Sequence, residues 1–336
     1  MKRLFSFFLV SLLTISLSLG CARAEGSGER LQIVTTIFPP FDFTRQIVKD
    51  NADVTMLLRP GAESHSYEPT PQDIKNIQNA DLLIYNGGEN DVWVEEILAS
   101  MGDQKPDTLK MMDCVQTVAE EIEGGMEHEH DHEHEAHEED HEENHDHEHD
   151  EDHNHDHEAA PEMDEHVWTS PKNAMAIVRA IAKTLSVKDA ANAASYAENS
   201  QAYITELEAL DAAFRTVCDA APHKTLLFGD RFPFRYLADE YGLTYYAAFT
   251  GCSTETEASA ATVAFLIDKA KAEKLPVIFT IEMSNGKIAD SICEAVGAEK
   301  ALLHSCHNVT RDELAAGETY LTLMTKNVQA LQEALQ

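Results

Sequence analysis

The sequence predicts an α/β protein that consists of two similar, Rossmann-like lobes, each built on a parallel sheet. Short apolar runs typical of buried strands alternate with longer segments of helical periodicity, and this alternation favours parallel sheets. It occurs twice, over residues 31–112 and again over residues 224–334. With 336 residues and 43% hydrophobic content, the chain can bury two cores of ordinary size. We therefore expect an N-terminal lobe at 30–125 and a C-terminal lobe at 189–336.

The first lobe begins with a buried strand at 31–37, which Pro39 and Pro40 end. A later helix begins at residue 71, because Thr70 is a favourable N-cap and Pro71 suits the first helical position. The other elements that we expect in this lobe are helix 41–50, strand 54–58, strand 81–86, helix 89–100 and strand 108–112.

Two helices are predicted between the lobes. Ser170 and Pro171 start one that runs to about residue 186, and the second covers 189–219 with apolar residues at helical spacing. The elements that we expect after them are strand 224–228, helix 232–241, strand 243–249, helix 255–274, strand 276–282, helix 286–296, strand 300–304 and helix 318–334.

Residues 126–158 are almost entirely histidine and carboxylate, with 12 His and 17 Asp or Glu. Because almost no apolar side chain could offset the entropy cost of ordering this segment, we expect a flexible acidic loop. Imidazole is a preferred ligand of zinc, copper and nickel, whereas carboxylates alone favour calcium or magnesium. We interpret the loop as an accessory zinc collector rather than a solvated charge run. Its candidate ligands are His128, His130, His132, His134, His145, His147, His149, His153, His155 and His157.

The same loop fits the H-E-x-x-H pattern of zinc proteases, for example from His141 to His145. Such matches arise from composition alone in a segment of this kind, and none lies on an apolar helix face. The pattern therefore does not indicate a protease.

The N-terminus reads as a secretory signal, because Lys2 and Arg3 precede an apolar run at 4–19. This run is too short to be a convincing membrane span. Residues 1–21 end like a bacterial lipoprotein signal, which would make Cys21 a lipidated first residue that tethers the protein to the outer face of the cell membrane. Cleavage after Ala24 is the alternative. The net charge of −35 argues against a nucleic-acid partner.

The remaining five cysteines are odd in number and show no C-x-x-C spacing, so the sequence does not support a structural zinc site of cysteines. Outside the cytoplasm a disulfide can form, and we expect Cys252 to pair with Cys306 because both follow predicted strands.

Three histidines outside the loop are candidate metal ligands. His65 and His304 lie at the carboxyl ends of strands, where open parallel sheets bind their ligands. His166 precedes the helix that starts at Pro171. Each histidine alone would more simply be a surface or hydrogen-bonding residue, but three imidazoles with a water or carboxylate form a normal zinc site. The sequence therefore predicts a zinc site in a cleft between the lobes.

The chain combines five motifs: Gly61 to Pro69, Glu165 to Pro171, Phe234 to Ala238, Tyr241 to Leu243, and Asn327. Together they resemble those of the zinc- and manganese-binding solute-binding proteins of ABC transporters, the ZnuA-like family, over essentially the whole mature chain. The resemblance implies two lobes joined by one long rigid helix, with metal held between them. It identifies residues 164–186 as a metal-ligand segment followed by the linking helix, and His65 and His166 as the first two ligands.

One position departs from the family pattern. The third ligand of the family, a His or Glu, corresponds to Arg231, which cannot bind a metal. Asp230, an open water position or a loop histidine could replace it, and Arg231 could pair with Asp230 or Glu282. The fourth family ligand, an Asp, corresponds to His304, and His307 lies close by. A set of metal ligands that contains more nitrogen atoms favours zinc over manganese.

We therefore expect a monomeric extracytoplasmic receptor that captures Zn²⁺ as its cargo and delivers it to an ABC permease and its ATPase. No bond is made or broken, so no enzyme activity is expected. The alternatives are a manganese or iron receptor, a surface adhesin or metal-buffering lipoprotein, and a three-histidine metalloenzyme. The last lacks an evident general base apart from Glu63 or Glu282.

Overall fold

The computed structural model describes residues 30–64, 67–121, 162–253 and 257–336 of the chain. Cys21, His65 and the histidine-rich segment 126–158 lie outside these residues. All elements described below belong to one compact unit, Leu31–Gln336. Within the described ranges, no helix combines the length and the apolar character needed to cross a membrane.

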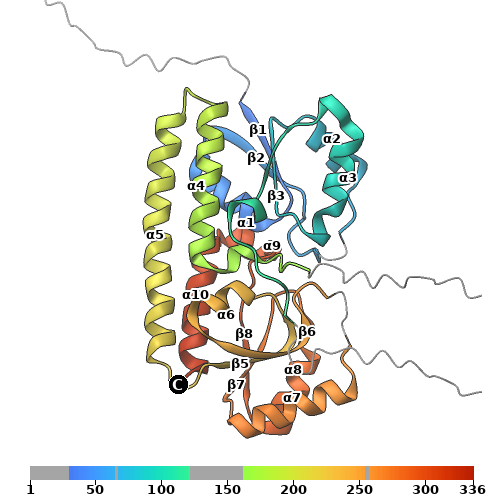
Figure 1. Cartoon of the computed structure of the whole chain (residues 1–336), viewed down its shortest axis with the longest axis vertical. Coiled ribbons are helices and arrows are strands. Elements are labelled where there is room, and N and C mark those ends of the chain that lie inside the picture. Colours follow the sequence, from blue (N-terminus) through green and yellow to red (C-terminus); the bar gives the residue numbers. More distant parts are fainter. Residues whose placement is uncertain (1–29, 65–66, 122–161, 254–256) are drawn as a thin grey trace, which may run out of the picture. The chain divides into compact units, whose positions relative to one another are not determined.

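Two four-stranded parallel sheets form the two lobes, as the sequence predicted (Figure 1). Their strand orders are equivalent: β2-β1-β3-β4 in the first lobe and β6-β5-β7-β8 in the second. The strands are β1 Leu31–Thr35, β2 Ala52–Met56, β3 Leu82–Tyr85, β4 Asp107–Lys110, β5 Thr225–Phe232, β6 Thr244–Thr250, β7 Val277–Thr280 and β8 Glu299–Leu302.

The helices of the first lobe are α1 Phe38–Val48, α2 Pro71–Gln78 and α3 Val92–Met101. Helix α1 begins three residues before the predicted start because prolines occupy its first turn, where a missing N–H costs no hydrogen bond. Helix α2 begins as predicted, and Thr70 and Asp73 form a reciprocal capping box at its N-terminus.

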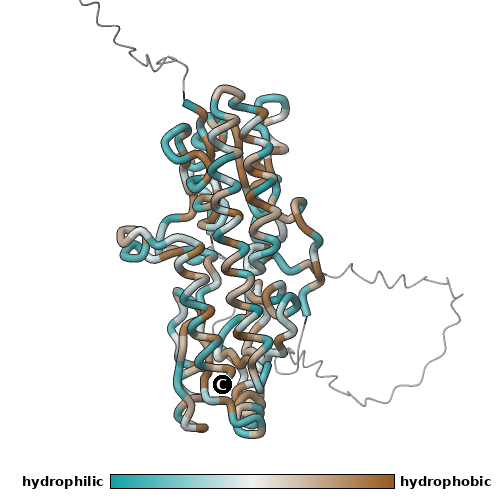
Figure 2. Tube along the Cα trace, turned by 90° about the vertical axis from the view of Figure 1, so that its left-hand side faces the viewer, coloured by the Kyte–Doolittle hydropathy of each residue, from teal (hydrophilic) through white to brown (hydrophobic). Residues whose placement is uncertain are grey.

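Two long helices lie side by side along the lobes, α4 Pro171–Lys188 and α5 Ala193–Ala220 (Figure 1). Helix α5 contacts α1 in the first lobe and both α6 Arg235–Tyr241 and α10 Tyr320–Ala334 in the second. The helix that spans both lobes is therefore α5, whereas the segment that we expected in this role, 171–186, is α4. In Figure 2 these helices face the viewer, and hydrophobic and hydrophilic residues alternate along them, as amphipathic packing requires.

The second lobe is completed by α7 Ala260–Glu273, α8 Lys287–Val296 and α9 Arg311–Ala316. Helix α9 was not predicted, because six residues are too few for a periodic pattern. Its signal was the capping box that Thr310 forms with Glu313.

One hydrophobic core runs through both lobes. It contains Ile33 and Leu82 from the first sheet, Leu226 and Phe228 from the second, and the buried face of α5, including Phe214. Burying one such side chain contributes roughly 1.5–3 kcal/mol. Because a wide hinge motion would expose this shared core, we expect the lobes to shift only slightly against each other.

The predicted disulfide is wrong, since Cys252 and Cys306 are both free thiols. Cys306 is fully buried, and its backbone N–H donates to the His304 ring. Cys252 is only partly buried, and its backbone N–H donates to the Glu120 carboxylate. The two cysteines follow different strands, and each belongs to a different hydrogen-bonded cluster.

Candidate metal centre

A small cleft lies between the lobes, where residues that follow β2 and β8 meet the end of β5. Its cavity volume is about 20 Å³, and its walls include Glu63, His166, Arg231, Glu282 and His307. A cavity of about 10–15 Å³ already holds one water molecule. This interlobe cleft therefore has room for an ion.

His166 lies on a short segment just before α4, and its side chain is fully buried. Its Nδ1 atom lies 3.2 Å from the Asp164 carboxylate, which also accepts the His166 backbone N–H at 2.8 Å. With Asp164 accepting the Nδ1 proton, Nε2 carries the lone pair that a metal would use. Asp164 therefore fixes both the orientation and the tautomer of this imidazole.

The carboxylates around His166 and the burial of its ring have opposite effects on its pKa. Burial by itself lowers the pKa of His166, but the neighbouring Asp164, Glu165 and Glu120 carboxylates outweigh it and raise that pKa. The same negative charges favour a bound cation. Glu165 is itself fixed, because its carboxylate accepts hydrogen bonds from the backbone and side chain of Asn90.

The motif residue Tyr236 supports the same segment from the second lobe. Its hydroxyl donates to the Asp164 carbonyl at 2.7 Å and accepts the Val118 N–H at 3.3 Å. Gly251 also approaches the His166 ring so closely that a Cβ atom there would lie 3.0 Å from the ring. The segment is thus positioned by residues distant in sequence.

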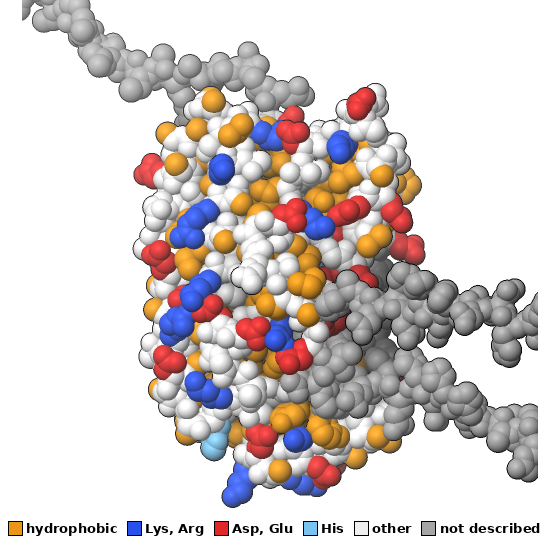
Figure 3. Space-filling model, viewed as in Figure 1, with side chains coloured by type: hydrophobic (Ala, Val, Ile, Leu, Met, Phe, Trp, Pro, Cys, Tyr) orange, Lys and Arg blue, Asp and Glu red, His pale blue; other side chains and the backbone are white. Residues whose placement is uncertain are grey.

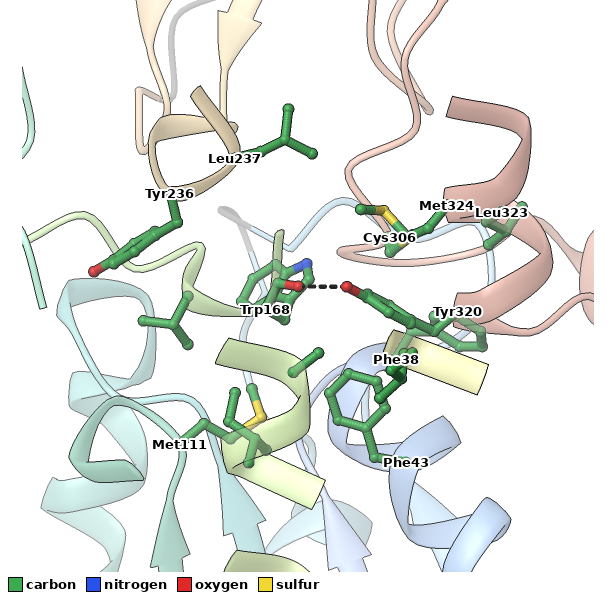
Figure 4. Close-up of a cluster of buried hydrophobic side chains, with 14 of the residues drawn as sticks. Phe38, Phe43, Met111, Trp168, Tyr236, Leu237, Cys306, Tyr320, Leu323 and Met324 are labelled. Carbon is green, nitrogen blue, oxygen red and sulfur yellow. Dashed lines mark hydrogen bonds between the residues drawn. The ribbon is translucent and has the colours of Figure 1, made fainter. Parts of the chain in front are cut away.

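Trp168 anchors the segment to the turn after β8 and to helix α10; the contact with Tyr320 of α10 is drawn in Figure 4. Its indole N–H donates to the Ser305 carbonyl at 2.7 Å. Its own carbonyl accepts the Tyr320 hydroxyl, also at 2.7 Å, as Figure 4 shows. Trp168 and Tyr320 are fully buried, as a core contact requires. These bonds hold the His166 segment against the turn that carries His304 and His307.

His307 is the histidine of that turn that faces the cleft. Its ring lies 5.5 Å from the His166 ring, between centroids, and 5.0 Å from the Trp168 ring. Two imidazoles that share one tetrahedral zinc have centroids about 5 Å apart, given Zn–N bonds of about 2.0–2.1 Å. The separation of His166 and His307 therefore suits a common metal ion.

His304 takes a different position from the one we expected for a ligand. It is 3% exposed but is not among the residues that line the interlobe cleft. Its Nδ1 accepts the Cys306 N–H at 2.9 Å, and its Nε2 lies 3.6 Å from Glu313. This contact with His304 helps lower the pKa of Glu313 to about 2. Asn327, from the family motif, bonds both backbone groups of His304.

The turn itself has an unusual backbone. Cys306 has a φ of 61°, which is uncommon for a residue with a side chain, and Met283 in the opposing wall has a φ of 62°. Glu282 secures the turn by accepting the backbone N–H groups of Ser305 and His307 at 2.7 and 3.1 Å. Such backbone conformations often occur at binding sites, where the surrounding structure enforces them.

The loop that leads to His65 is anchored on the second lobe, although His65 itself lies outside the described residues. The Asn308 amide donates to the carbonyls of Arg59 and Ala62, both at 2.8 Å. The Gly61 N–H donates to the Val309 carbonyl, also at 2.8 Å. The described part of this loop therefore ends with Ser64 in the wall of the cleft.

Arg231 lies in the cleft wall, where the family pattern has a ligand. Its Nη1 atom donates to the Glu63 carboxylate at 3.1 Å, so the pair joins the two lobes. Asp230 does not share the cleft with Arg231; its carboxylate accepts the Thr280 hydroxyl at 2.7 Å. Of the predicted additional residues, the structure thus places His307, Glu282 and Arg231 in the cleft.

Sequence reasoning missed two positioning residues. Asp164 stands two residues before His166, and an acid so close to a candidate ligand was a usable signal. Asn308 had no such signal, because its partners Arg59 and Ala62 are about 250 residues away.

The residues that precede and follow segment 122–161 pair with each other beside the cleft. Ala119 pairs with Met163 in an antiparallel bridge, and the Glu120 N–H donates to the Glu162 carbonyl at 2.8 Å. Glu120 shares a surface pocket with Gly251, which also lines the cleft.

On the face drawn in Figure 3, described acidic and basic side chains are interspersed rather than gathered into one basic patch.

Comparisons with known proteins agree with this geometry. The family model "Zinc-uptake complex component A periplasmic" (ZnuA) matches residues 33–334. The chain is 36% identical over 315 residues to "High-affinity zinc uptake system protein ZnuA" of Bacillus subtilis, covering 93% of this chain and 90% of that protein. It is 32% identical to "Zinc-binding lipoprotein AdcA" of Streptococcus pneumoniae, covering 99% of this chain but only 61% of that longer protein.

Two solved structures share the fold. The metal-dependent lipoprotein YcdH of Bacillus subtilis has a TM-score of 0.72 and 32% identity, covering 91% of this chain and all of the other. The Zn(II)-bound ZnuA-like domain of Streptococcus pneumoniae AdcA has a TM-score of 0.70 and 28% identity, covering 91% of this chain and 99% of that domain. Because the family model matches nearly the whole described chain and the two-lobed fold agrees, this protein belongs to the ZnuA family.

Proposed function

We propose that this protein is an extracytoplasmic receptor that captures Zn²⁺ in the interlobe cleft and delivers it to an ABC permease. Three imidazoles hold the ion: His65, His166 and one from the turn after β8. The geometry supports His307 for the third position, because its ring shares the cleft with His166, whereas His304 is engaged with Cys306 and Glu313. A water molecule or Glu282 completes the tetrahedral set.

The observation that carries the proposal is the pair of imidazoles, 5.5 Å apart between ring centroids, in a cleft that has room for an ion. Asp164 behind His166 supplies the carboxylate that metal-bound histidines usually have. Relatives named for zinc uptake and zinc binding, and a relative solved with Zn(II) bound, support the same metal.

The transport role follows from the family and from the fold. The family is named as component A of a zinc-uptake complex, so the partners are a permease and its ATPase. Capture and delivery make and break no covalent bond. Because one core runs through both lobes, release proceeds through modest shifts of the lobes and loops. Cys21 anchors the protein as a lipoprotein, as the name of one relative supports.

The histidine-rich segment 126–158 acts as a low-affinity collector that raises the zinc concentration near the cleft. The residues that flank the segment, Ala119 and Met163, pair in an antiparallel bridge, and Glu120 shares a surface pocket with Gly251 of the cleft wall. This attachment beside the cleft supports the proposal. Deleting 126–158 is expected to lower the zinc stoichiometry while sparing one tight site. Loss of the tight site on deletion would contradict the collector role.

The test is a calorimetric zinc titration of the mature chain without residues 126–158, with manganese as a parallel titrant. We expect one tight zinc event that manganese does not reproduce, and we expect His166→Ala to abolish it. If no tight zinc event occurs, or if His166→Ala leaves it intact, the cleft is not the zinc site. Tight manganese binding would instead favour a manganese receptor.

A further inference from the structure

Arg231 reaches the interlobe cleft from an irregular strand. The pairing of β5 with β6 changes register between Phe228 and Arg231, as in a β-bulge. Gly229 allows this path, because a Cβ atom there would lie 2.4 Å from the backbone of Ala289. Bulges redirect the side chains that follow them, so the backbone itself directs Arg231 to this wall.

The hydrogen bonding of Arg231 is incomplete. The residue is 8% exposed, and its Nη1 atom donates to Glu63. Its Nε atom is buried and has no hydrogen-bond partner among the residues that the structure describes. Since buried N–H groups are normally paired, this guanidinium is not fully satisfied where it lies.

A second cavity adjoins the cleft at Arg231. Its volume is about 150 Å³, and it shares Glu63, Arg231 and Glu282 with the cleft. Asp230, Ser284 and Asn285 also line it, so it offers carboxylate, hydroxyl and amide oxygens. This side cavity has the room and the acceptors that a guanidinium requires.

A zinc ion in the cleft would repel Arg231 strongly. The two cations would line the same partly buried space, where charges interact more strongly than in bulk water. A guanidinium cannot lose its proton to relieve the repulsion. It can only move away or weaken the binding of the metal.

We propose that Arg231 is a displaceable cation that sets the zinc affinity of the cleft. Without metal, Arg231 pairs with Glu63 across the lobes; when zinc enters, its guanidinium moves into the side cavity towards Asp230. Its return favours release of the ion, which a receptor that delivers its cargo requires. This inference rests on the proposed zinc-binding function.

The test compares full-length mature proteins at chelator-buffered free zinc. Arg231→Met keeps the bulk of the side chain and removes the charge, so it should bind zinc about tenfold more tightly or better, since the repulsion is lost. It should also release zinc to a chelator more slowly in stopped flow. Arg231→Lys keeps a charge and should fall between wild type and Arg231→Met. The matched control is Arg215→Met, which removes a cation paired with Asp211 and Glu240 outside both cavities.

If folded Arg231→Met binds zinc as wild type does, or more weakly, while His166→Ala abolishes binding, the inference fails and the zinc function stands. If neither wild type nor Arg231→Met has a tight site, the proposed function fails as well. Should Arg231→Met not fold, Arg231→Gln provides the same comparison. A crystal structure with zinc gives a second check: Arg231 in the side cavity supports the proposal, and Arg231 still paired with Glu63 overturns it.

Discussion

The segment before α4 and the turn after β8 both bring buried histidines to the junction of the lobes, but they hold them in different ways. The ring of His166 is held at Nδ1 by Asp164 and faces a small cavity. The ring of His304 is engaged at Nδ1 by a backbone N–H and faces Glu313 at Nε2. Burial alone therefore does not identify a ligand, and our proposal rests on the lining of the cleft and on the partners of the ring nitrogens.

The turn after β8 contains both kinds of histidine within four residues. His307 lines the cleft, whereas Asn327 and Cys306 tie His304 into the core. Cys306, with its positive φ, lies between the two. We therefore propose that His307, and not His304, takes the ligand position of this turn, because His307 lines the cleft.

The largest expected effect separates these two histidines. His307→Ala should weaken tight zinc binding by at least about 100-fold, because a direct ligand matters more than a supporting group, whose loss costs about 10–100-fold. His304→Ala should lower zinc affinity far less and mainly reduce stability. Both are measured by competition with a zinc chelator and by thermal unfolding. The reverse order of zinc affinities would restore His304 as the ligand.

A smaller effect is expected from the carboxylate behind His166. Asp164→Asn should lower zinc affinity by about 10–100-fold, because the amide holds the imidazole less firmly in the tautomer that binds metal. Glu165→Gln is the matched control, since Glu165 is held by Asn90. If both variants lose zinc affinity equally, only the total negative charge near the cleft controls that affinity.

The smallest effect on zinc affinity is expected from substitution of Asn327, whose side chain bonds the backbone of His304. Asn327→Ala leaves the buried N–H and C=O of His304 without their amide partner and should cost about 1–3 kcal/mol of unfolding free energy. Zinc affinity should change by no more than about threefold, because the side chain does not reach the cleft. Denaturant unfolding measures the first quantity, with Gln201→Ala on α5 as the control. A large loss of zinc affinity at retained stability would make Asn327 part of the metal site.

The fold class and most of the helices and strands could be predicted from the amino-acid sequence. Alternating apolar runs and helical periods are local signals, and so is the capping box of Thr70 and Asp73, which the structure contains. Local signals also indicated which segments carry the site, because loops at the carboxyl ends of parallel strands converge. The sequence did not reveal that α5 rather than α4 spans both lobes, since that depends on packing.

The assembly of the candidate site could not be predicted from the sequence, because it depends on tertiary contacts. Whether His304 or His307 faces the cleft depends on a backbone turn and on Asn327, and the partner of Arg231 turned out to be Glu63 rather than Asp230 or Glu282. Asn308 could not be found from sequence, because it holds a loop about 250 residues away. Periodicity and spacing report contacts within a segment, whereas the orientation of a side chain between two lobes depends on groups that only folding brings together.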